Sequence, residues 1–296
     1  MTGIARVLVG PAPRIGLSLA GSGPLVVFLH GIGGNRTHWD DQLPVFAREF
    51  TACAWDARGY GDSDDYDGPL AFADLGADCL RVLDFLGAER AHLVGLSLGG
   101  RIARDLCLRH PERVATLTLC NTHAGFDDLA PEAVDAFLRA RRDPLAAGKE
   151  LRDLAPGLAR GIVGKSAVPG AYERLVASLA GLRKHTYLRT LEASVREDRG
   201  APVEHIAVPT LVVTSDEDAV YPPATAERLA RRIPGARLAV LQGAGHVSNL
   251  DQPERFNAAV LAFLREHRDR ASEPSPATIM RRVKATVDAT KVRRGS

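Results

Sequence analysis

The spacing of apolar residues along the chain alternates between two patterns. Short continuous apolar runs are typical of buried parallel strands, and they occur at 25–29, 51–55, 92–94, 114–119, 210–213 and 237–241. Apolar positions recur at helical spacing over 36–48, 73–87, 98–109 and 254–267. Residues 5–20 favour an antiparallel pair of strands at a sheet edge. Together these patterns predict an α/β fold with a mostly parallel, doubly wound sheet.

Two segments depart from this alternation. Residues 124–205 are rich in Ala, Leu and Arg, contain no convincing strand and predict several helices. We expect a helical cap over an active site, with a purely structural addition as the alternative. The core then comprises 1–123 and 206–270 and leaves a basic tail, 271–296, which carries six Lys or Arg and two acidic residues. We expect this tail to be disordered or helical; a helix over 279–291 could contact a membrane surface or a partner.

The composition narrows the class of protein. Of the 296 residues, 45% are apolar and 25% are charged, and the net charge is +2, so nothing points to nucleic acid. We expect no membrane insertion and no secretory leader, because no apolar run reaches the required length. The four cysteines form no metal-binding pattern, so we expect no metal or cofactor and buried thiols in a cytoplasmic protein. They are Cys53, Cys79, Cys107 and Cys120.

A serine between glycines is the first candidate for chemistry. Gly95-Leu96-Ser97-Leu98-Gly99 lies where the strand at 92–94 meets the helix at 98–109. A sharp strand-to-helix turn of this kind exposes a nucleophilic hydroxyl and needs small neighbours. The helix that follows directs its first amides toward the serine and favours negative charge there. We therefore predict that Ser97 is a nucleophile.

A serine hydroxyl needs a base, and the base needs a carboxylate. His246 lies in a glycine-rich loop after the strand at 237–241, where its ring can reach Ser97. Three acids follow the strand at 210–213, and Asp218 is preferred over Asp216 and Glu217 because it lies a little beyond the strand end. The chain order serine, acid, histidine is the order expected for this architecture.

Acyl transfer also requires donors for the oxyanion. The strand at 25–29 ends in His30-Gly31-Ile32-Gly33-Gly34, a glycine-rich loop that can turn an amide toward Ser97. We expect the backbone amides of Ile32 and Leu98 to be the two donors.

The serine turn, the late acid, the later histidine and the His-Gly loop together resemble the α/β-hydrolase fold superfamily. The segment DARGYGDS at 56–63 matches a pattern common in this group; we expect it to be structural, with Arg58 paired locally. Within the superfamily, three segments are similar to 3-oxoadipate enol-lactonases and small carboxylesterases. They are GLSLGG at 95–100, LTLCNTHAG at 117–125 and GAGHVSNLDQPERFN at 243–257.

The resemblance says less about the pocket. The segment 124–205 has no tryptophan, where enol-lactonases tend to carry aromatic residues. The candidate pocket residues are His30, Gly31, Trp39 and His123. Arginines of this segment could recognise a carboxylate substrate, but the sequence selects none of them.

The resemblance implies a serine hydrolase that cleaves a small ester or lactone through an acyl-enzyme on Ser97. Serine at this position argues against haloalkane dehalogenases and epoxide hydrolases, which use aspartate. A carbon–carbon bond hydrolase of ring-cleavage products and a cofactor-free haloperoxidase have the same three residues. Both remain alternatives. A non-catalytic ligand-binding protein is the alternative from a different class. The partner is a small molecule, and the oligomeric state is not predicted.

Overall fold

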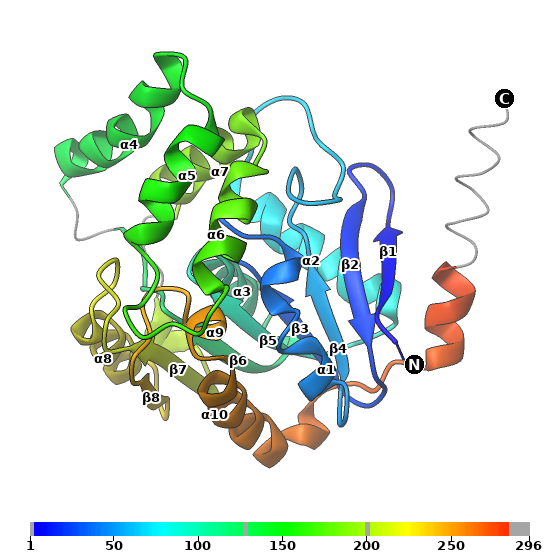
Figure 1. Ribbon diagram of the computed structural model, residues 1–296. Coiled ribbons are helices and arrows are strands. Elements are labelled where there is room, and N and C mark those ends of the chain that lie inside the picture. Colours follow the sequence, from blue (N-terminus) through cyan, green and yellow to red (C-terminus); the bar gives the residue numbers. More distant parts are fainter. Residues whose placement is uncertain (1–2, 127–129, 199–201, 284–296) are drawn as a thin grey trace, which may run out of the picture.

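The computed structural model describes residues 3–126, 130–198 and 202–283, and these build an eight-stranded sheet (Figure 1). The strand order is β1-β2-β4-β3-β5-β6-β7-β8. Strand β2 runs antiparallel to both of its neighbours, and every other pairing is parallel. The strands are β1 (Ala5–Val9), β2 (Ile15–Ala20), β3 (Leu25–Leu29), β4 (Thr51–Trp55), β5 (Ala91–Leu96), β6 (Val114–Cys120), β7 (Thr210–Ser215) and β8 (Arg237–Leu241). The predicted mostly parallel sheet is confirmed.

Helices cover both faces of the sheet, because alternate side chains of the central strands point to opposite sides. On one face Val27 of β3 packs with α2 (Phe72–Leu86), α3 (Leu98–Arg109) and α8 (Pro223–Arg232). On the other face Phe28 packs with α1 (Leu43–Phe46) and α10 (Pro253–Glu266). The two faces therefore form separate apolar clusters on either side of the sheet.

One predicted helix is wrong. Residues 36–48 do not form a single helix; they form a 3₁₀ turn at Arg36–Trp39 and the short α1. Pro44 lies in the first turn of α1 and lacks the amide that a continuous helix would need there. The side chain of Asn35 caps the earlier turn by accepting from the Thr37 amide at 2.9 Å.

Between β6 and β7 the described chain is helical. Figure 1 shows these helices gathered at one end of the sheet. We call them the insertion: α4 (Pro131–Ala146), α5 (Leu151–Arg160), α6 (Ala171–Ala180) and α7 (Lys184–Arg196). Its inner face has an apolar cluster of its own, which includes Leu138 and Tyr187 and against which Ile32 packs. The insertion therefore covers the loop that follows β3.

The segment after α10 passes the ends of the sheet where β3 and β5 begin. Ser272 accepts from the Leu25 amide at 2.9 Å and donates its own amide to the Arg90 carbonyl at 2.9 Å. Residues 276–283 are helical, and Ile279 is buried against the cluster that contains α2. Residues 284–291 of the helix expected over 279–291 lie outside the described residues.

Candidate active site

Ser97 lies at a sharp turn between β5 and α3. Its backbone has φ 53° and ψ −113°, an unfavourable conformation for a residue with a side chain. The neighbouring glycines are required by space: a Cβ on Gly99 would lie 2.0 Å from the Leu29 carbonyl oxygen, and one on Gly95 would lie 2.3 Å from the Gly99 carbonyl oxygen. The Ser97 amide donates to the Cys120 carbonyl at 2.8 Å, which holds the turn against β6.

The structure brings Ser97, His246 and Asp218 together in one hydrogen-bonded chain. His246 Nε2 lies 2.9 Å from Ser97 Oγ, and His246 Nδ1 lies 3.0 Å from one oxygen of Asp218 and 3.2 Å from the other. An ionised carboxylate can only accept hydrogen bonds, so Nδ1 carries the ring proton and Nε2 is free to accept from the serine hydroxyl.

Asp218 is held in its ionised form. Burial disfavours the charge, but hydrogen bonds from His246, the Tyr221 amide and Asn121 outweigh it and lower the pKa of Asp218 below its usual value. The two competing acids have other partners: Asp216 accepts from the Gly243 amide, and Glu217 accepts from the Lys165 amide. Of the three acids, Asp218 alone contacts His246.

The loop after β3 lies against Ser97. A Cβ built on Gly31 would lie 3.4 Å from Ser97 Cβ, so the backbone passes close to the serine. Among the described residues, the backbone amides of Ile32 and Leu98 donate to no protein acceptor. Both amides come from segments that flank Ser97, as an oxyanion site requires.

His30 supports this loop and does not line a pocket. It is 1% exposed; its Nε2 accepts from the Ala57 amide at 3.0 Å, and its Nδ1 therefore donates to the Gly31 carbonyl at 2.8 Å. Burial lowers the pKa of His30, which agrees with a neutral ring. This expected pocket residue is instead buried, and its ring nitrogens join the loop after β3, at Gly31, to the chain after β4, at Ala57.

Trp39 does not line a pocket either. It is fully buried between Phe28 and Phe256, with ring centroids 5.0 Å and 5.9 Å away. His123 does border a cavity of about 340 Å³, together with Phe126 and Tyr221. Of the four candidate pocket residues, His123 borders a cavity and Gly31 lies against the serine.

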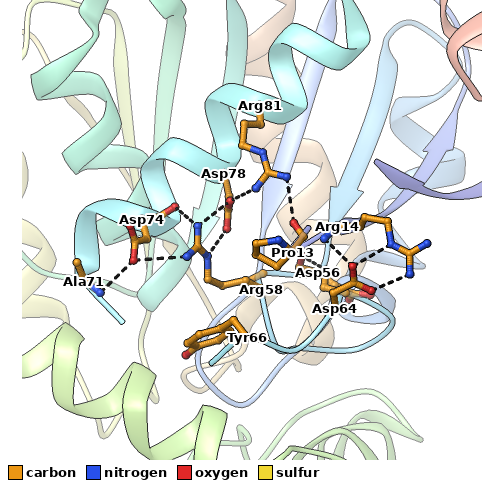
Figure 2. Close-up of polar contacts among 12 residues, drawn as sticks. Pro13, Arg14, Asp56, Arg58, Asp64, Tyr66, Ala71, Asp74, Asp78 and Arg81 are labelled. Carbon is orange, nitrogen blue, oxygen red and sulfur yellow. Dashed lines mark hydrogen bonds and ion pairs between the residues drawn. The ribbon is translucent and has the colours of Figure 1, made fainter. Parts of the chain in front are cut away.

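The segment at 56–63 is built from local polar contacts. Arg58 binds both oxygens of Asp78, at 2.6 and 2.9 Å, and lies 3.4 Å from a carboxylate oxygen of Asp74 (Figure 2). Asp56 accepts from the Arg36 amide at 2.7 Å and forms an ion pair with the Arg36 guanidinium. Because Arg58 is bound to two acids, it has no free charge to offer a substrate.

Asn121 is a site residue that the sequence reasoning missed. Its Nδ2 donates to Asp218 and to Ser215 Oγ, each at 3.0 Å, and its Oδ1 accepts from Ser248 Oγ at 2.6 Å. Asn121 also has φ 46°, a conformation that asparagine tolerates better than most residues. Its position directly after β6 was the available signal.

Asp251 is a second residue that was missed, and it joins the insertion to the histidine loop. One carboxylate oxygen accepts from the Gly164 amide at 2.8 Å and from the Gly245 amide at 2.7 Å. The His246 amide in turn donates to the Ile162 carbonyl at 2.8 Å. Burial raises the pKa of Asp251 to about 6. These bonds fix the loop between α5 and α6 onto the loop that carries His246.

A buried charge cluster joins the other end of the insertion to the serine helix. Asp198 follows α7 and forms ion pairs with Arg101 and Arg104 of α3. All three side chains are at most 5% exposed.

The described residues contain neither a metal site nor a helix that could span a membrane. No group of three His, Cys, Asp or Glu side chains there is placed to hold a metal ion. No helix in the described ranges has the length and apolar character needed to cross a membrane. All four cysteines are free and buried, and burial raises the pKa of each thiol. Thiolate chemistry is therefore disfavoured at these positions.

Residues 24–253 match the family model of the alpha/beta hydrolase fold, and the chain belongs to this family. It is 33% identical over 242 residues to “Putative carbamate hydrolase RutD” of Caulobacter sp. (strain K31), a match that covers 81% of this chain and 90% of the relative. It is 29% identical to 3-oxoadipate enol-lactonase 2 of Acinetobacter baylyi, covering 82% and 89%. A thermophilic esterase from Thermogutta terrifontis, solved with malate bound, has a TM-score of 0.79 at 26% identity and covers 90% and 99%. The chain is a hydrolase of this fold, and its relatives carry names for different bonds.

Proposed function

We propose that this hydrolase cleaves a small carboxylic ester or lactone through an acyl-enzyme on Ser97. The observation that carries the proposal is the hydrogen-bonded chain from Ser97 Oγ to His246 Nε2, 2.9 Å, and from His246 Nδ1 to Asp218, 3.0 Å. The 3-oxoadipate enol-lactonase among the relatives supports this choice of bond.

In the first half of the reaction, His246 Nε2 takes the hydroxyl proton as Ser97 Oγ attacks the carbonyl carbon. Asp218 stabilises the imidazolium that forms. The amides of Ile32 and Leu98 hold the oxyanion. His246 then protonates the leaving oxygen, and the carbon–oxygen bond breaks to leave an ester on Ser97.

In the second half, water gives a proton to His246 and attacks the acyl carbon. The tetrahedral intermediate collapses, Ser97 Oγ leaves and recovers the proton from His246, and the carboxylic acid is released. For a lactone, the acid and the alcohol leave as one molecule. The insertion serves as a cap over this site, because Ile32 packs against its inner cluster.

A carbamate is the second candidate substrate class, because a relative named as a carbamate hydrolase is 33% identical. The same three residues can attack a carbamate carbonyl, and release of carbamic acid would replace release of a carboxylic acid. A carbon–carbon bond hydrolase keeps the same site and remains the alternative that requires a different substrate.

The test is release of 4-nitrophenol from acetate, butyrate and octanoate esters, followed by a panel of lactones, an aryl carbamate and a coloured dienol. Ser97→Ala and His246→Ala should each lose nearly all turnover, while His110→Ala, a surface histidine beside Glu112, should keep it. Ester or lactone turnover that survives in Ser97→Ala refutes the mechanism. Turnover of the dienol alone moves the assignment to carbon–carbon cleavage, and binding without turnover of any compound moves it to a ligand-binding protein.

A further inference from the structure

Arg141 differs from the buried arginines described above in the partners of its guanidinium. It lies on α4 and is partly buried; its Nη1 donates to the Phe137 carbonyl at 3.1 Å, and its guanidinium lies 3.5 Å above the Phe137 ring. Among the described residues, the hydroxyls of Tyr187 and Tyr221 are the polar side-chain groups that act on its charge, and neither is a carboxylate. Burial lowers the pKa of Arg141, as expected for a cation that has lost water without gaining an anion.

Other buried arginines of the described chain are paired with carboxylates. Arg101 and Arg104 share the carboxylate of Asp198, and Arg58 is bound by Asp78. Each of these guanidiniums is neutralised within the protein. Within residues 3–126, 130–198 and 202–283, no carboxylate pairs with Arg141, so its charge is available to an anion.

The space beside Arg141 can hold such a group. A cavity of about 230 Å³ lies between α4, α5 and α7. Tyr187 and Arg141 supply its polar side chains, and the remaining lining residues are Ala140, Pro144, Leu154, Gly157 and Leu158. One face of the guanidinium is stacked on Phe137 and Nη1 donates to the Phe137 carbonyl, so a carboxylate would bind at the remaining N–H groups of its edge. That geometry matches a planar carboxylate.

A run of aromatic contacts leads from this cavity toward the serine. Phe137 borders the 340 Å³ cavity together with Tyr221. The Tyr221 ring lies 5.3 Å from the ring of His246, which bonds to Ser97. The charge of Arg141 also acts on Tyr221. Phe137 therefore lies between Arg141 and a cavity that is also bordered by Tyr221, a neighbour of His246.

We propose that Arg141 binds a carboxylate of the substrate, so that this hydrolase selects esters or lactones of acids that carry a second, ionised carboxylate. The inference rests on the proposed function, since the reacting carbonyl must lie at Ser97 while the distant carboxylate lies at Arg141. Arg141 is a specificity-determining residue and takes no part in the bond changes.

The experiment compares matched pairs of substrates. Mono-4-nitrophenyl esters of straight-chain dicarboxylic acids with five to eight carbons carry a free carboxylate, and their methyl-capped forms are neutral. We expect the wild-type enzyme to prefer the charged member at one chain length. Arg141→Met should reduce kcat/KM for that substrate about 10- to 100-fold more than for its neutral partner, mainly through KM. Arg139→Met, an exposed arginine on the same helix, should leave both values unchanged.

The outcomes separate the two proposals. Equal loss on the charged and neutral esters in Arg141→Met, or no preference for the charged ester in the wild type, overturns the carboxylate site while the serine mechanism stands. Activity retained in Ser97→Ala overturns the mechanism whatever Arg141 does. Inhibition by the free dicarboxylates gives an independent readout: it should weaken in Arg141→Met by a similar factor and stay unchanged in Arg139→Met.

Discussion

Replacing Asp198 by Asn tests how much of the fold depends on one buried anion. The side chain of Asp198 is 5% exposed, and those of its partners Arg101 and Arg104 are 4% and 1% exposed. One oxygen accepts from Arg101 Nε at 2.5 Å, and the other accepts from the Arg104 guanidinium. Asparagine has nearly the same shape, so the change removes charge and leaves volume almost unaltered.

The expected cost follows from what remains after the substitution. Two buried guanidiniums lose their shared anion, and the amide nitrogen of the asparagine places a donor against one of them. Removing one partner from a buried ion pair typically costs about 3–5 kcal/mol. At roughly 2–4 °C per kcal/mol for a large domain, we expect the Tm to fall by about 6–20 °C.

Urea and thermal unfolding, followed by circular dichroism, measure this cost. The matched control is Asp135→Asn, which removes a carboxylate 3.1 Å from Arg196 in a pair that is about half exposed. We expect that control to cost about 0.5 kcal/mol or less. Adding Arg104→Met to Asp198→Asn should recover part of the lost stability, because one unpaired charge is removed. Asp198→Asn that unfolds at the same urea concentration as the control would refute the reasoning.

Three further changes test the site. Gly99→Ala should abolish turnover and lower the Tm, because its Cβ would meet the Leu29 carbonyl at 2.0 Å; wild-type kcat and Tm would contradict this. Asp218→Asn should keep the fold and reduce kcat by about 10⁴, because the amide no longer fixes the tautomer of His246; a loss below tenfold would contradict it. For Asp251→Asn, the raised pKa of about 6 determines how the stability difference between variant and wild type changes with pH. Ionisation of the wild-type group between about pH 4 and 6 costs stability, so the variant gains relative to wild type as pH rises through that window, by up to about 3 kcal/mol. Urea midpoints at pH 4.5 and 7.5 measure this gain, and a constant difference would contradict it.

The strand pattern could be predicted because buried parallel strands are short, apolar and separated by glycine or proline. The predicted runs at 25–29 and 51–55 have the bounds of β3 and β4. The prediction of one helix over 36–48 was wrong because apolar spacing does not show that Pro44 begins a new, separate helix. Ser97, His246 and Asp218 could be selected because each follows a strand whose carboxyl end faces the same edge of the sheet.

The pocket could not be predicted in the same way. A tryptophan after the oxyanion loop looks the same in sequence whether it lines a cavity or packs between Phe28 and Phe256, as Trp39 does. Asn121 and Asp251 act through contacts with segments more than 80 residues distant or with the loop of His246. Arg141 could not be separated from the other arginines of 124–205 without knowing which of them meet an acid. Those pairings depend on how the helices of the insertion pack.

The insertion is attached to the core more firmly at some of its helices than at others. Its α5–α6 loop is tied to Asp251, α6 donates from Ser178 to the Gly33 carbonyl, and the end of α7 is held by Asp198. Among the described residues, the side-chain hydrogen bonds and ion pairs of α4 stay within the insertion. Because α4 is the helix of the insertion without such bonds to the core, we expect it to move most easily and substrate to enter beneath it. Because Arg141 lies on α4, an anionic substrate bound to it would stabilise the closed position of this helix.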